Sequence, residues 1–166
     1  MPDFRISARK GTPEGQPGPL SLVETLIHRA DDIANRYKLV ASNIPYRNLR
    51  ERPLDEDVSS LSAHLAAATW KRIGDEVPSY AFAENVGRRY RDAGKPVGSL
   101  LLHWHVFRRA IHLVLADESI RTGVGDEDKL RQATLMNYTL DWATEASLVS
   151  YVIANPTDGQ SPGSND

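Results

Sequence analysis

Three histidines lie close together in the segment 97–117, where they could bind a metal ion or transfer protons. The apolar spacing of this segment predicts one long helix, and a helix turns by about 100° per residue. His103 and His105 then point roughly 160° apart, so they cannot bind one ion from the same helix. His105 and His112 share a face but lie about 10 Å apart, too far to share an ion without other ligands. We therefore expect no metal site, and we interpret these histidines as solvated or at the edge of the core.

Arginines follow His105 on the same face of this predicted helix. Arg108 and Arg109 come one turn later and His112 comes two turns later, which gives a basic ridge beside the apolar stripe. A guanidinium group binds a carboxylate or a phosphate through paired hydrogen bonds, so a small anion could bind here. The same arginines, together with those in 88–91, could instead form a solvated face or ion pairs with nearby acids. Both interpretations remain open.

Each of the three tryptophans falls in an apolar helical stripe, which is typical of a core residue; they are Trp70, Trp104 and Trp142. His103 lies on a partly apolar face beside Phe107, so a buried haem ligand is a further interpretation. A site for haem or a small anion would use five residues of this helix: His103, Trp104, His105, Arg108 and His112. Our main expectation is that the protein holds no cofactor.

The sequence has no pattern typical of an enzyme. It contains no cysteine, which excludes disulfides, thiolate catalysis and cysteine-based metal sites. The acids of 55–57 and 126–128 fall at predicted helix starts, where the helix dipole accounts for them. Asp32 lies on a polar face with Arg36 one turn on, so we expect these two to pair. No phosphate-binding glycine motif and no nucleophile elbow is present, and we therefore expect a protein without catalytic activity.

The charge balance also limits the partners that we expect. The 166 residues carry 20 basic and 22 acidic side chains, a formal net charge of −2. Such a chain has no long-range attraction to nucleic acid or to an anionic membrane. No apolar run approaches the roughly 20 residues that span a bilayer, and residues 1–19 lack the apolar stretch of a signal peptide. We expect a cytoplasmic protein that binds neither nucleic acid nor membranes.

Proline, glycine and serine dominate both ends of the chain. We predict a disordered N-terminal arm over 1–19, one helical domain over 20–154 and a disordered C-terminal tail over 155–166. The spacing of apolar residues predicts an all-α bundle of about five helices. They cover about 21–41 with a capping box at Ser21, then 55–77, 79–94, 97–117 and 126–154, the last capped by Asp126.

The last predicted helix has two apolar stripes. One contains Met136, Leu140 and Ala143. The second contains Tyr138, Trp142, Val149 and Ile153. A helix that is apolar on two sides must be covered on two sides. Such a helix could lie in the centre of the bundle or pack against a second subunit. We favour the second arrangement and predict a homodimer whose interface includes these four residues of the second stripe.

The segment from residue 83 resembles the N-terminal sensory domain of stressosome proteins of the RsbR type. The resemblance lies in helix punctuation, namely Gly87-Arg88, Gly94, Pro96, Leu100-Leu101, Arg108 and Ile111, and in the helical layout of about 20–154. It implies a globin-like fold without haem, a helical dimer, and a domain that relays a signal to a partner protein. Nothing about ligand binding by His103 or His105 follows from it. Because no output domain follows residue 154, we expect a single-domain relative, an excised sensor domain or a different protein.

The most consistent hypothesis from the sequence is a bacterial sensor or regulatory module. It would dimerise and relay a signal to a partner protein. The alternative is a globin relative that holds haem or a small anion near the fourth predicted helix.

Overall fold

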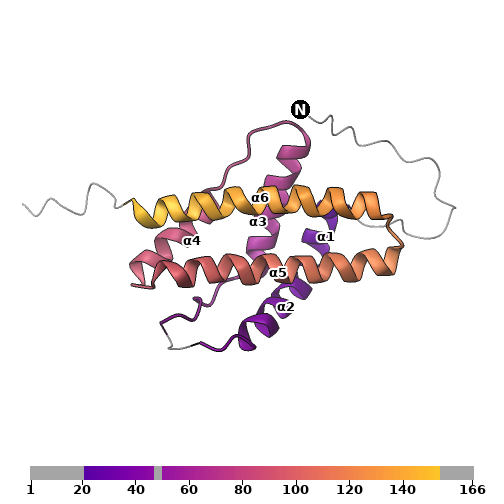
Figure 1. Cartoon of the computed structure of the whole chain (residues 1–166). Helices are drawn as coiled ribbons and strands as arrows, with labels where there is room; N and C mark the ends of the chain where they lie inside the picture. The colour runs from indigo at the N-terminus through magenta and orange to yellow at the C-terminus, as the bar shows by residue number, and fades with distance from the viewer. Residues whose placement is uncertain (1–20, 47–49, 154–166) are drawn as a thin grey trace, which may run out of the picture.

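The computed structural model describes residues 21–46 and 50–153, and these residues form an all-α bundle (Figure 1). Its helices are α1 (Leu22–His28), α2 (Ala30–Ser42), α3 (Val58–Ile73), α4 (Ala81–Asp92), α5 (Val97–Thr122) and α6 (Asp126–Val152). No strand occurs among these residues, which confirms the all-α prediction. The arm and the tail predicted at the two ends lie outside the described residues.

The bundle is built around α5. In Figure 1 the long helices α5 and α6 run side by side in opposite directions, and α2 packs on another side of α5. Buried residues occur along most of α5, among them Leu100, Phe107 and Ile111. Helix α4 packs mainly on α6, while α1 and α2 both contact α3. A helix covered on several sides needs apolar residues on several sides, which α5 has.

The described chain has six helices where the sequence predicted about five. The predicted first helix breaks at Arg29, whose φ of −108° and ψ of 20° interrupt the helical backbone. The break gives α1 and α2 different neighbours, because α2 packs on α5 while α1 packs mainly on α3. It also places the Arg29 guanidinium 2.8 Å from the carboxylate of Glu118 on α5. The Glu118 side chain is only 4% exposed, so the ion pair compensates the free-energy cost of burying its charge.

The helix ends follow the sequence in part. The capping box at Ser21 is present, with Glu24 N donating to Ser21 Oγ and Ser21 N donating to the Glu24 carboxylate. Gly94 adopts a left-handed φ of 61° just after α4, as expected of a residue that ends a helix. The predicted helix over 126–154 is present as α6, but its predicted N-cap was wrong, because Gly125 is the N-cap and Asp126 is the first helical residue. Helix α5 also continues past 117 to Thr122, and its C-cap Gly123 has a left-handed φ of 65°.

Two further side-chain predictions were wrong. The predicted pair of Asp32 with Arg36 does not form. Arg36 pairs with Asp117 on α5 at 2.7 Å, and Asp32 pairs with Arg29, three residues before it. The cause is the packing of α2 on α5, which brings a second carboxylate within reach of Arg36. Trp70 is 65% exposed, so its stripe on α3 does not face the core at that point.

Gly87 permits the close approach of α4 and α6. A Cβ atom added at this position would overlap the backbone of Ser147 and the Ser150 hydroxyl. Ser150 Oγ donates a 2.8 Å hydrogen bond to the carbonyl oxygen of Glu84, one turn before Gly87. Glycine is therefore required here for helix packing and not for an unusual backbone angle.

Within the described ranges, no helix combines the length and the apolar character needed to cross a membrane.

We expect Gly87→Ala to destabilise the protein by about 1–3 kcal/mol, because α4 and α6 must separate to admit the methyl group. This loss opposes the gain of up to about 1 kcal/mol that alanine usually brings to a helix interior. Gly98→Ala on α5 is the matched control, since a Cβ atom at Gly98 meets no atom within 4 Å. Urea denaturation measures both. Equal stability of the two variants would contradict the close packing of α4 on α6.

Candidate functional site

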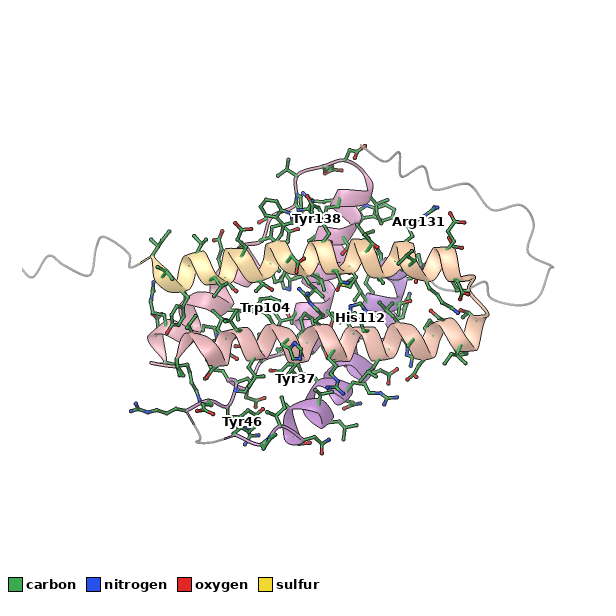
Figure 2. The ribbon with its side chains drawn as sticks, viewed as in Figure 1. Tyr37, Tyr46, Trp104, His112, Arg131 and Tyr138 are labelled. Atoms are coloured by element: carbon green, nitrogen blue, oxygen red, sulfur yellow. The ribbon has the colours of Figure 1, made fainter. Side chains whose placement is uncertain are left out.

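The five residues predicted to bind a ligand on α5 do not form one site. His103 and Trp104 are buried, at 0% and 2% exposed, whereas His105 on the other side of α5 is exposed. The opposite directions of His103 and His105 agree with the helical geometry. Arg108 forms an ion pair with Asp141 of α6, and His112 Nε2 lies 2.9 Å from Asn137 Oδ1. Figure 2 shows Trp104 and His112 between α5 and α6. The predicted basic ridge is thus used in part to join two helices.

His103 forms the centre of a buried polar and aromatic cluster. Its Nδ1 atom lies 2.8 Å from the hydroxyl of Tyr37 on α2, and no hydrogen-bond partner reaches its Nε2 atom. Four rings surround the imidazole with centroids 5.2–6.3 Å away, those of Tyr37, Tyr90, Trp104 and Phe107. The sequence interpretation of a solvated or core-edge histidine was therefore wrong for His103. The apolar residues that share its helix face, such as Phe107, were the sequence signal for its burial.

Burial keeps the His103 ring uncharged. The loss of water, with a smaller contribution from the positive charge of Arg89, lowers the pKa of His103 to about 3. The neutral ring carries one proton, and a Tyr37 hydroxyl that donates to Nδ1 places that proton on Nε2. Burial likewise raises the pKa of both Tyr37 and Tyr90, so their hydroxyl groups stay protonated. At neutral pH the cluster contains no charged ring.

The surroundings of His103 do not fit a haem group. An axial histidine needs a free imidazole nitrogen that faces a wide cavity. The Nε2 atom of His103 is enclosed by packed rings. The structure has a groove between α3 and α4 and a smaller hollow between α2 and α5, and His103 lines neither of them. Among residues 21–46 and 50–153, no three histidine or acidic side chains gather closely enough to hold a metal ion.

Sequence reasoning missed a buried carboxylate just before α3. It attributed the acids of 55–57 to the helix dipole, and Asp57 does cap α3 by accepting a hydrogen bond from Ser60 N. Glu56, however, turns inward, and its side chain is only 2% exposed. Tyr90 holds this segment in place, because Leu54 N donates to the Tyr90 hydroxyl at 2.9 Å. No local pattern in the sequence distinguishes Glu56 from its two acidic neighbours.

Glu56 is paired on one side only. Its Oε2 atom accepts a 2.8 Å hydrogen bond from the guanidinium of Arg89 on α4, and no hydrogen-bond partner reaches its Oε1 atom. Burial raises the pKa of Glu56, and the positive charge of Arg89 partly opposes this. Both residues line a groove of about 450 Å³ between α3 and α4. The groove thus combines an apolar interior with a charged end.

The second predicted apolar stripe of α6 is exposed in the single chain. Tyr138, Trp142, Val149 and Ile153 are 49%, 42%, 49% and 59% exposed. In contrast, Met136, Leu140 and Ala143 of the first stripe are fully buried against the bundle. Figure 2 shows Tyr138 on the side of α6 that faces away from α5. The sequence thus predicted two apolar sides, and the bundle covers one of them.

Arg72 connects this exposed stripe to the rest of the bundle. Its guanidinium lies over the rings of Tyr138 and Trp142, 4.5 and 5.6 Å from their centroids. Its Nε atom also donates a 2.8 Å hydrogen bond to the hydroxyl of Tyr80, just before α4. Cation–π contacts of this kind hold a guanidinium in place on an aromatic surface. The end of α3, the start of α4 and the α6 stripe therefore meet at Arg72.

Comparison with known proteins finds no family model, no curated protein and no solved structure that matches this chain.

We expect the stability of the protein to fall as the pH falls from about 6.5 to 3, through His103. The unfolded chain binds a proton on this residue near pH 6.5, whereas the folded chain does not until about pH 3. The slope is about 1.4 kcal/mol per pH unit, so the loss from this residue between pH 7 and 5 is about 2 kcal/mol.

The double variant His103→Leu, Tyr37→Phe should lack this part of the loss, because it removes both partners of the buried hydrogen bond. His105→Gln, which replaces an exposed histidine, should keep the pH dependence of the original chain. Urea denaturation at pH 7 and pH 5 gives the comparison. A double variant with the same loss as the original chain would show that His103 becomes protonated in the folded state.

Proposed function

We propose that this chain is a cytoplasmic bacterial sensor module of the non-haem globin type, which dimerises and relays a signal to a partner protein. The observation that supports it best is the exposed apolar stripe of α6. At 100° per residue, Tyr138, Trp142, Val149 and Ile153 lie within about 60° of one another around the helix. Single exposed apolar residues are ordinary, but a contiguous set that includes two aromatic rings is typical of a protein–protein interface. The resemblance of residues 83–111 to RsbR-type sensory domains supports the signalling part of the proposal.

The spacing of the stripe favours a second copy of the chain as the partner on this face. Trp142 and Val149 are equally far from a point between Glu145 and Ala146, and so are Tyr138 and Ile153. A two-fold axis through that point would place each aromatic ring of one copy opposite an aliphatic side chain of the other. Such pairing is the rule in an isologous interface, where residue i meets residue j and j meets i. We therefore propose an antiparallel pairing of α6 with α6 of the partner.

Arg72 offers a physical route from the bundle to this interface. Since it holds Tyr138, Trp142 and Tyr80 together, a shift of α3 or of the start of α4 would move the two rings of the α6 stripe. A signal in the bundle would then change the dimer surface through small movements of packed helices.

The proposal assigns no catalytic step to the chain. A general base works best with a pKa near the working pH, whereas burial lowers the pKa of His103 to about 3. Arg108 and His112 are engaged by α6, which does not favour the alternative of an anion site on α5.

We expect the double variant Trp142→Glu, Val149→Glu to be monomeric. It replaces two apolar side chains of the proposed interface with carboxylates, one turn to either side of Glu145, so like charges of the two copies would meet. Multi-angle light scattering of the eluted protein measures the mass. Ile120→Glu is the control, since Ile120 is an 81% exposed apolar residue of α5 away from the stripe, and it should stay dimeric. Circular dichroism confirms that each variant is helical. An unchanged dimer mass for the double variant would refute this interface.

Single cysteines test the direction of pairing, and the chain has no cysteine of its own. Glu145→Cys should form a covalent dimer on mild oxidation, because the proposed axis brings the two copies of this position together. Val149→Cys should not, since its two copies would be about 10 Å apart along the helices. Non-reducing gel electrophoresis separates the two results. Cross-linking of Val149→Cys without Glu145→Cys would indicate a parallel pairing instead.

A further inference from the structure

The groove between α3 and α4 has the form of a small-molecule site. Helices α3 and α4 are joined by residues 74–80, yet they pack mainly on other helices and leave about 450 Å³ between them. Ligand pockets commonly have 300–1,000 Å³ and an apolar lining with few polar groups. The apolar side chains that line this groove are Leu61, Ala67, Ala68, Ala81, Phe82 and Val86. None of them belongs to the buried cluster around His103 or to the exposed stripe of α6. Polar side chains line it as well, among them Lys71, which pairs with Glu76 and lies on α3 about four turns from Asp57.

An aromatic contact joins the α3 side of the groove to the α4 side. The His64 ring stacks on Phe82, with centroids 5.6 Å apart and an angle of 26° between the planes. His64 Nδ1 donates a 2.8 Å hydrogen bond to the carbonyl oxygen of Ser60, which fixes the ring orientation. This ring pair therefore connects α3 to α4 beside Ala67 and Ala68 of α3.

One end of the groove carries charges of both signs. Glu56, Asp57 and Arg89 line it together, and Arg89 uses one guanidinium nitrogen on Glu56 Oε2. A guanidinium group has five N–H donors, so Arg89 can bind a second acceptor at the same time. Glu56 is nearly fully buried and its Oε1 atom has no hydrogen-bond partner, although buried polar atoms are usually paired.

This set of charges selects against ligands of a single charge. A simple carboxylate near Arg89 would also face the carboxylates of Glu56 and Asp57, and a simple amine near those acids would face Arg89. A ligand with an ammonium and a carboxylate group on neighbouring atoms matches both signs at once. The apolar lining then requires an apolar side chain on the same ligand.

We propose that the α3–α4 groove binds a free α-amino acid with an apolar side chain. Its carboxylate binds Arg89, its ammonium group faces Glu56 and Asp57, and its side chain lies against Leu61, Ala68 and Val86. A bound amino acid would be a signal for the sensor module, and that role alone rests on the proposed function. Binding itself is measurable on a monomer or a dimer, so the two proposals fail independently.

Isothermal titration of the full chain with L-leucine tests the proposal. The two controls are 4-methylpentanoate, which lacks the amine of leucine, and 3-methylbutylamine, which lacks the carboxylate. We expect saturable binding of leucine, and binding of each control at least about tenfold weaker, because each leaves one sign of charge unmatched. Equally tight binding of either control would overturn the assignment, and so would the absence of saturable leucine binding at millimolar concentration.

Two variants test the residues that the proposal names. Arg89→Gln removes the partner of the ligand carboxylate and should weaken leucine binding at least about tenfold. Arg88→Gln is the matched control, because Arg88 is the preceding residue on α4 and does not line the groove. Its partners Glu84 and Asn85 both lie on α4 itself. It should bind leucine like the original chain.

Asp57→Asn covers the case in which Arg89→Gln fails to fold. Asparagine still caps a helix, so this variant keeps the start of α3 while it removes one negative charge from the groove. It should weaken leucine binding several-fold and leave the binding of 4-methylpentanoate unchanged or tighter. Unchanged leucine binding by Asp57→Asn would place the ligand elsewhere and overturn the proposal.

Discussion

The structure depends on the burial of α5, since a helix enclosed on several sides must find a partner for every polar group that it carries inward. It does so with few exceptions. His103 meets the Tyr37 hydroxyl of α2, and Trp104 Nε1 donates a 2.7 Å hydrogen bond to Ser147 Oγ of α6. Glu118 pairs with Arg29 at the break between α1 and α2. These contacts fix where α2 and α6 lie on α5, because an unpaired buried polar group costs about 1–3 kcal/mol.

The two sites that we propose lie outside this buried centre, and both follow from how the remaining helices cover it. Helix α6 packs one apolar stripe against the bundle and leaves the other exposed. Helix α4 packs on α6 through Gly87, which draws it away from α3 and leaves a groove between the two. Arg72 contacts the α6 stripe, and its partner Tyr80 contacts the ring of Phe82 in the groove. The same packing therefore creates both surfaces and joins them.

The sequence predicted what depends on local spacing. It correctly indicated an all-α chain, the capping box at Ser21, the role of Gly94 and the two apolar sides of α6. It could not predict the break at Arg29 or the partner of Arg36, because both depend on contacts with α5. Glu56 was missed for the same reason, since its partner Arg89 lies 33 residues away. The sequence places His103 on a partly apolar face, but its partner Tyr37 could not be predicted because that contact depends on how α2 packs on α5.

We infer that a second copy of the chain covers the exposed stripe of α6. Sedimentation equilibrium of the unmodified protein over a wide concentration range tests it most directly. The account predicts a mass of twice the chain at micromolar concentration, with a reversible shift toward the single chain on dilution. A mass of one chain at the highest concentrations would contradict it.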